Sequence, residues 1–270
     1  MFQRLALTAL HRWGEKEGRK PLVLRGARQV GKTTLVKLFA REFDVFIELN
    51  LEEKENARLF AWEVSFDDLL AGIYAKAGVR MENKRTLIFI DEIQNEPEAV
   101  RSLRYFYEKR PDLHVIAAGA LLESLVGNHI SFPVGRVEYM ALHPCTFTEF
   151  LGALGENVLV EQIERLTVPQ SVHSYVMDLF RKYMIVGGLP EAVANYAKYK
   201  DWVRLNDIFN SLIAGYKDDI EKYAKELQKL GAKNVLISLG GDGAMLIDEF
   251  GKRHKAGVLK EKVINTVGSG

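Results

Sequence analysis

The chain has 270 residues, of which 47% are hydrophobic and 27% are charged, and its formal net charge is +1. This composition is typical of a globular protein with a substantial core. So small a net charge gives no general electrostatic reason to bind nucleic acid or an anionic membrane. The lone cysteine, Cys145, excludes an intramolecular disulfide, and we expect it to be a small buried side chain at the start of a helix.

The chain begins with an apolar stretch, Leu5 to Leu10, which we interpret as part of an amphipathic helix. This stretch is too short for the apolar core of a signal peptide, and His11, Arg12 and Trp13 follow it at once. No apolar run in the chain approaches the roughly 18 residues of a membrane-spanning helix. We therefore expect a cytoplasmic protein with no membrane partner.

A strand candidate at 21–25 leads directly into a complete G-x-x-x-x-G-K-[ST] pattern at 26–33, and helically spaced apolar residues follow it. Strand, glycine loop and helix are the setting of a phosphate-binding loop, whose backbone N–H groups point at a β-phosphate. Lys32 is then expected to bridge the β- and γ-phosphates, and the hydroxyl of Thr33 to hold Mg²⁺. The predicted nucleotide-binding residues are Gly26, Ala27, Arg28, Gln29, Val30, Gly31, Lys32, Thr33 and Thr34. For Arg28 the alternative is a side chain that points to solvent.

A second motif lies at the end of the apolar run 86–91, which is typical of a buried strand in a parallel sheet. Asp91 at its carboxyl end is expected to orient Mg²⁺ through water. The next residue, Glu92, is placed to polarise the attacking water as a general base. The alternative is an exposed acidic turn. An Asp-Glu ending favours ATP hydrolysis over a GTP switch, and the chain has no Asn-Lys-x-Asp motif for reading guanine.

The rest of the chain predicts an α/β fold in which a P-loop NTPase parallel sheet is flanked by helices. Further strand candidates lie at 45–49, 115–118 and 137–142, and they alternate with helical patterns near 66–77 and 98–109. From 146 to 224 the pattern is helical only, with a break at 187–190. We expect an ATPase core at 1–143, a helical lid at 144–224, and a short α/β C-terminal fragment at 225–270.

Several segments together resemble the AAA-type ATPases of archaea and bacteria that carry a C-terminal domain of unknown function, DUF4143. The resemblance covers residues 1–224 and rests on Leu24 to Thr34, Ile90 to Gln94, Ser131 to Arg136, Thr146 to Phe150, Gly187 to Pro190, and Tyr216 to Ile220. It implies a P-loop ATPase core with a helical lid and, in the family, a further domain. It implies an activity and no particular biological target.

The core departs from this family after the strand candidate at 115–118. Gly119-Ala120 stands there, where such ATPases usually have Gly-Ser, whose hydroxyl senses the γ-phosphate or holds the attacking water. A methyl group has no donor, so Ala120 predicts slower hydrolysis with nucleotide binding largely intact. Arg136 is a candidate catalytic residue that would pair with the γ-phosphate, in the same chain or across a subunit boundary. The alternative for Arg136 is an exposed arginine beside a strand.

The tail, from about residue 225, resembles a different family, the pfkB-type sugar kinases related to ribokinase. Strand candidates at 235–239 and 244–247 flank the tight turn 240–243, and 265–270 reads Asn-Thr-Val-Gly-Ser-Gly. In that family an Asp that acts as the catalytic base follows this stretch, and the printed sequence stops one residue before it. The sugar-binding half of the fold is also missing, so the residues argue against sugar kinase activity. We expect a fusion, or a recombination or assembly product, joined within 221–226.

The sequence therefore predicts Mg²⁺-dependent ATP binding and hydrolysis that drive a conformational change. A nucleotide-dependent binding module with negligible hydrolysis is the first alternative, and a non-functional fusion or truncation product is the second. The sequence identifies neither a protein partner nor an oligomeric state.

Overall fold

A computed structural model gives the fold for residues 2, 4–61, 64–82, 84–119, 132–211, 224, 227–228, 231–238 and 244–257. The chain divides into two compact units, Met1–Asp201 and Trp202–Gly270. In the described part of the chain, no helix has the length and apolar character needed to cross a lipid bilayer.

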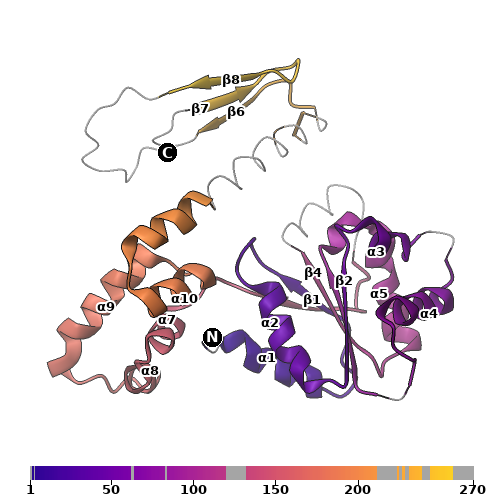
Figure 1. Ribbon diagram of the computed structural model, residues 1–270, viewed down its shortest axis with the longest axis horizontal. Coiled ribbons are helices and arrows are strands. Elements are labelled where there is room, and N and C mark those ends of the chain that lie inside the picture. Colours follow the sequence, from indigo (N-terminus) through magenta and orange to yellow (C-terminus); the bar gives the residue numbers. More distant parts are fainter. Residues whose placement is uncertain are drawn as a thin grey trace. The chain divides into compact units, whose positions relative to one another are not determined.

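The first unit is built on a parallel sheet of five strands in the order β2-β3-β4-β1-β5 (Figure 1). The strands are β1 (Leu22–Arg25), β2 (Val45–Asn50), β3 (Thr86–Asp91), β4 (His114–Gly119) and β5 (Glu138–Ala141). All neighbouring pairs are parallel, which confirms the predicted sheet. Because every residue of β3 and β4 is buried, these strands have no polar face, as expected for a sheet covered on both sides.

Helices cover both faces of this sheet, with α1 and α2 on one side and α4 and α5 on the other (Figure 1). The helices are α1 (Leu5–Glu15), α2 (Lys32–Phe39), α3 (Lys54–Arg58), α4 (Phe66–Ala77) and α5 (Pro97–Lys109), and short 3₁₀ turns are η1 (Ala40–Glu42) and η2 (Ile93–Asn95). The helix predicted from 32 to 43 is thus a shorter α-helix followed by a 3₁₀ turn. Helix α3 was not predicted, because five residues are too few to show a periodic pattern.

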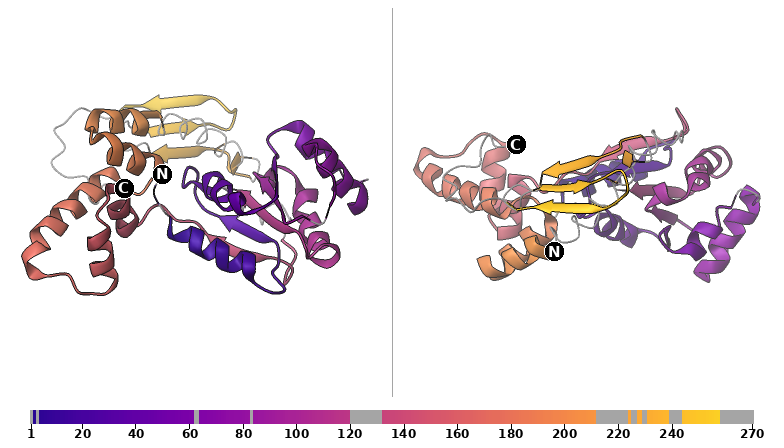
Figure 2. Two further views of the ribbon diagram at one scale, coloured as in Figure 1. Left: turned by 60° about the horizontal axis from the view of Figure 1, so that its bottom comes forward. Right: turned by 90° about the horizontal axis from the view of Figure 1, so that it is seen from above.

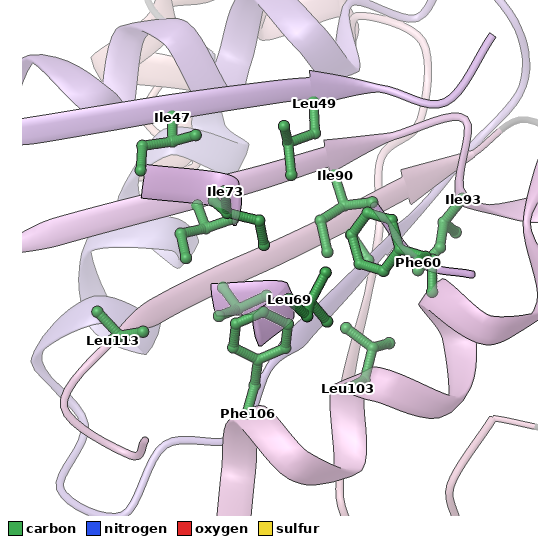
Figure 3. Close-up of a cluster of buried hydrophobic side chains, with 14 of the residues drawn as sticks. Ile47, Leu49, Phe60, Leu69, Ile73, Ile90, Ile93, Leu103, Phe106 and Leu113 are labelled. Atoms are coloured by element: carbon green, nitrogen blue, oxygen red, sulfur yellow. The ribbon is translucent and has the colours of Figure 1, made fainter. Parts of the chain in front are cut away.

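The two faces of the sheet make two separate hydrophobic clusters, since side chains alternate along each strand. In β3, Leu87 and Phe89 pack against α1 and α2, whereas Ile88 and Ile90 pack on the opposite face. Figure 3 shows this second cluster, in which Ile90 lies with residues such as Phe106 of α5. Burial on both faces fixes the sheet as a rigid platform, and the loops at its edge take their positions from it.

Helices follow the sheet, as the sequence predicts for the described part of 146–224. They are α7 (Phe147–Leu154), α8 (Asn157–Glu164), α9 (His173–Val186) and α10 (Pro190–Tyr199), with a 3₁₀ turn η3 (Gln170–Val172) and further helix at 202–211. Thr146 begins α7 with a reciprocal capping box: its hydroxyl accepts from the Glu149 N–H, and the Glu149 carboxylate accepts from the Thr146 N–H. Residues 212–223 lie outside the described part.

The second unit contains a three-stranded antiparallel sheet, β6-β7-β8 (Figure 2). Its strands are β6 (Val235–Ser238), β7 (Ala244–Ile247) and β8 (Arg253–Ala256). The first two strands were predicted, but β8 was not, because Arg-His-Lys-Ala is exposed throughout and has no apolar alternation. The predicted turn at 240–243 and the glycine-rich stretch 265–270 lie outside the described residues, as do most positions of the expected seam at 221–226. The division at 143/144 and 224/225 stays a prediction.

Candidate functional site

The glycine loop connects β1 to α2 at the carboxyl edge of the sheet, where ligands of open α/β folds bind. Gly31 has a φ of 87° and begins α2 without a side-chain cap, so the amides of the first turn are directed at the loop. Gln29 also has a positive φ, of 63°. At the other end of the loop, a Cβ on Gly26 would lie 2.4 Å from the backbone oxygen of Leu142. The loop is therefore closely packed at its first glycine and left-handed at its last.

Lys32 lies within the loop with only 7% of its surface exposed. Its ammonium donates hydrogen bonds to the carbonyl oxygens of Gly26 and Ala27, both at 2.9 Å. Burial lowers the pKa of Lys32, and the negative charges of Glu92 and Asp91 oppose this shift. The predicted lysine is thus held inside the concave face of the loop, beside two carboxylates.

The two predicted metal ligands meet, although they are 58 residues apart in the sequence. Thr33 Oγ1 donates to Asp91 Oδ2 at 2.7 Å, at the point where β3 ends and α2 begins. Burial raises the pKa of Asp91, while the hydrogen bonds from Thr33 and from the Glu92 N–H hold it down. A hydroxyl and a carboxylate are the hard oxygen donors that suit Mg²⁺, which takes its other ligands from phosphate and water. The described residues contain no group of three His, Cys, Asp or Glu side chains that could hold a metal.

Glu92 follows directly on this pair and has a left-handed backbone, with φ 52° and ψ 43°. Its N–H donates to Asp91 Oδ1 at 3.0 Å, and its carboxylate accepts a hydrogen bond from the Gln94 side-chain amide. A non-glycine residue in this conformation turns the chain sharply at the end of β3. No role was predicted for Gln94, although it ends the segment Ile90 to Gln94 and places an amide two residues after the candidate base.

Arg136 does not face the glycine loop of its own chain. It precedes β5, so it lies toward the amino ends of the parallel strands, whereas the loop follows the carboxyl end of β1. Its side chain is 43% exposed and pairs with Glu108 at 2.8 Å, which agrees with the alternative of a surface arginine beside a strand. The structure therefore does not bring Arg136 to the glycine loop of its own chain, and its pairing with a γ-phosphate, in the same chain or across a subunit boundary, stays a prediction. Ala120 lies outside the described residues, so its effect on hydrolysis also stays a prediction.

A cavity of about 360 Å³ adjoins the outer side of the loop and was not predicted. Its lining comes from the N-terminal segment, the loop, α2 and α10, and comprises Phe2, Arg4, Gln29, Gly31, Thr34, Leu35, Leu38, Pro190, Glu191 and Ala194. Sequence reasoning missed it because the lining residues come from segments up to about 190 positions apart.

The break before α10 brings this helix against the loop. Cys145 N–H donates to the Gly188 carbonyl at 2.6 Å, and a Cβ on Gly188 would lie 2.7 Å from the Cys145 oxygen, so only glycine fits. Two residues later, Pro190 Cγ lies 3.5 Å from the Cβ position of Gly31. Cys145 is buried, as predicted, and burial raises the pKa of its thiol to about 11.

Known proteins resemble this chain in two parts. Residues 18–151 match the family model of an AAA domain, and residues 191–270 match that of the pfkB family of carbohydrate kinases. The match to the pfkB family begins at residue 191, inside α10. The sequence predicted that this resemblance begins later, at about residue 225. Residues 18–151 thus resemble an AAA domain and residues 191–270 a pfkB-family segment, and the relation to DUF4143 proteins stays a prediction.

Two individual proteins agree with this assignment. The chain is 28% identical over 246 residues to the replication factor C large subunit of Thermococcus kodakarensis, an alignment covering 83% of this chain and 44% of that protein. The chain thus spans less than half the length of this relative. Its structure resembles a Walker-type ATPase of Pyrococcus abyssi with a TM-score of 0.54 and 17% identity, covering 84% of this chain and 77% of the other. The structural likeness supports a P-loop ATPase fold.

Proposed function

We propose that the chain binds ATP with Mg²⁺ and hydrolyses it. The observation that carries this proposal is the contact between Thr33 and Asp91, because it joins the ends of two separate motifs at 2.7 Å. Lys32 lies beside them, so a cation, a hydroxyl and two carboxylates converge where the α2 N-terminus attracts anions. The match of 18–151 to an AAA domain supports the same reaction.

In this proposal each residue acts as its chemistry allows. The loop amides and the Lys32 ammonium would bind the phosphates. Thr33 and Asp91 would hold Mg²⁺, which when bound would supply positive charge beside the phosphates. Glu92 accepts the proton of the attacking water through its carboxylate. Gln94 donates to that carboxylate and so limits its orientation.

The cavity beside the loop is the proposed position of the nucleotide base. Its largely apolar lining suits the faces of a flat aromatic ring, and it includes Gly31 and Thr34, which border the proposed phosphate site. Pro190 and Ala194 of α10 supply one wall, so bound nucleotide would contact the helical lid. This arrangement gives the nucleotide-bound and the empty chain different contacts at α10, which is what a nucleotide-dependent movement of the lid requires.

The test measures Mg²⁺-dependent phosphate release by the purified chain. Glu92→Gln should retain ATP binding and lose turnover, since an amide cannot accept the proton, whereas Lys32→Ala should lose affinity. Glu108→Gln is the matched control, because this exposed carboxylate pairs with Arg104 and Arg136 away from the loop. Full turnover in Glu92→Gln refutes the assignment of the base, and turnover without added divalent cation refutes the metal role.

A nucleotide-dependent binding module is the second candidate, and the specific observation that favours it is Ala120 in place of a hydroxyl-bearing residue. It predicts ATP binding in the titration with no phosphate release above the Glu92→Gln blank. The relative from Thermococcus kodakarensis is one subunit of a replication factor, and this supports a protein partner or oligomer for the present chain. Size measurement with and without ATP tests that part of the proposal.

A further inference from the structure

The side chain of Arg4, at the start of α1, makes a set of buried contacts that the proposed reaction does not use. Only 8% of Arg4 is exposed. Its Nη1 donates to the Val30 carbonyl at 3.1 Å, and its Nη2 donates to the His143 carbonyl at 2.7 Å. Its Nε pairs with Glu149 Oε1 at 2.9 Å. One guanidinium therefore joins the glycine loop, the segment before the lid, and helix α7.

The contact with Val30 fixes the direction of the next amide in the loop. The described chain contains no cis peptide bond, and in a planar trans peptide the C=O and the following N–H point to opposite sides. Because the Val30 oxygen is held by Arg4, the Gly31 N–H is turned to the side away from Arg4. Gly31 itself has a left-handed φ of 87°. Because glycine has no Cβ to restrict its backbone, contacts such as the one from Arg4 decide how the Val30–Gly31 peptide is turned.

Glu149 holds the guanidinium in place. Its Oε1 accepts from Arg4 and from the Leu5 N–H at 2.8 Å, and its Oε2 accepts from the Thr146 N–H at 2.8 Å. Both oxygens are satisfied, so neither charge of this buried pair is left without partners. The pair therefore has little freedom to rotate away from the loop.

We propose that Arg4 is a positioning residue for the glycine loop, which holds the Val30–Gly31 peptide so that the Gly31 amide faces the phosphates of a bound nucleotide. This inference rests on the proposed nucleotide site. An amide bonded to a charged oxygen contributes enough for its misorientation to weaken binding about tenfold or more.

The test separates positioning from stability. Arg4→Met alone leaves a buried carboxylate unpaired and is expected to destabilise the fold strongly. The double variant Arg4→Met/Glu149→Gln removes both charges, and the Gln oxygen still accepts a backbone N–H, yet nothing is left to donate to Val30. Glu149→Gln alone keeps the donors of Arg4, and Thr146→Val removes only the hydroxyl that caps α7. The readouts are the melting temperature and the Kd for MgADP and for inorganic tripolyphosphate, which has no base to enter the cavity that Arg4 lines.

We expect the affinity for both ligands to depend on whether Arg4 is present and anchored, and not on the melting temperature of the variant. Thr146→Val should lower the melting temperature and keep both Kd values within about twofold of the original chain, whereas the double variant should bind both ligands at least about tenfold more weakly. Glu149→Gln alone keeps the Arg4 donors but no longer anchors them by charge, so its Kd values should lie between those of Thr146→Val and the double variant. A double variant that binds tripolyphosphate as well as the original chain does overturns the inference. So does an original chain that binds MgADP but not tripolyphosphate. If the original chain binds neither ligand, the proposed function fails, and the inference fails with it.

Discussion

Acidification should destabilise the unit that contains the parallel sheet through His114, at the start of β4. This residue is 5% exposed. One of its ring nitrogens faces a group that can only accept a hydrogen bond, and the other faces a group that can only donate one. Nε2 lies 3.0 Å from the Gly14 carbonyl, which only accepts, and Nδ1 lies 3.1 Å from an Arg19 Nη2, which only donates. The ring is therefore neutral, with its proton on Nε2. Protonation of Nδ1 would set two donors against each other.

The lowered pKa of His114 gives the free-energy cost of protonating Nδ1 in the folded chain. Burial is the main cause that lowers this pKa from 6.5 to about 4; the charges of Arg19 and Arg85 add to the shift, and the bond to Gly14 opposes it. The unfolded chain then takes up the proton first, so the stabilisation is complete above pH 6.5 and is lost as pH falls toward about 4. The complete shift corresponds to about 3 kcal/mol, of which about 2 kcal/mol is lost between about pH 7.5 and about pH 5.

Urea denaturation at several pH values tests this magnitude, with His114→Gln as the comparison. Gln can donate to the Gly14 carbonyl and accept from Arg19, but it does not titrate in this range. Subtracting the two unfolding free energies cancels the other titrating groups. The stability advantage of the original chain should shrink by about 2 kcal/mol across the interval. Equal pH dependence in both proteins would refute the reasoning.

Two further predictions concern packing around the loop. Gly26→Ala should weaken nucleotide binding and cost about 1–3 kcal/mol of stability, since its Cβ would lie 2.4 Å from a backbone oxygen. Gly152→Ala in α7 is the control: no atom lies within 4 Å of its Cβ, so it should be neutral or slightly stabilising, and equal effects of both in thermal melts and MgADP titration would contradict this account. Cys145, buried and with a pKa of about 11, should react with iodoacetamide at neutral pH far more slowly than in urea-unfolded chain. Rapid labelling of the folded chain would show that the segment before the lid opens readily.

The sequence by itself determined the sheet and the chemistry at its edge. The glycine loop and the Asp91-Glu92 ending are runs of adjacent residues, each tied to the strand before it, so their chemistry can be seen without knowing the fold. The five strands were also predicted, and in β3 and β4 burial on both faces leaves continuous apolar runs. Once the sheet is parallel, the carboxyl ends of β1 and β3 lie at one edge, and the contact between Thr33 and Asp91 follows.

Only the tertiary structure decided which residues from distant parts of the sequence lie at the carboxyl edge of the sheet and contact the glycine loop. Arg4 and Glu149 are 145 positions apart, and although Glu149 belongs to the capping box that begins α7, no local pattern pairs it with Arg4. Arg136 has the residue type of a phosphate ligand, yet its place before β5 sets it at the wrong end of a strand. Local sequence records periodicity and turn chemistry, whereas long-range pairing depends on how the whole chain packs. The candidate phosphate-binding residues could therefore be predicted from the sequence, but the distant residues that contact their loop could not.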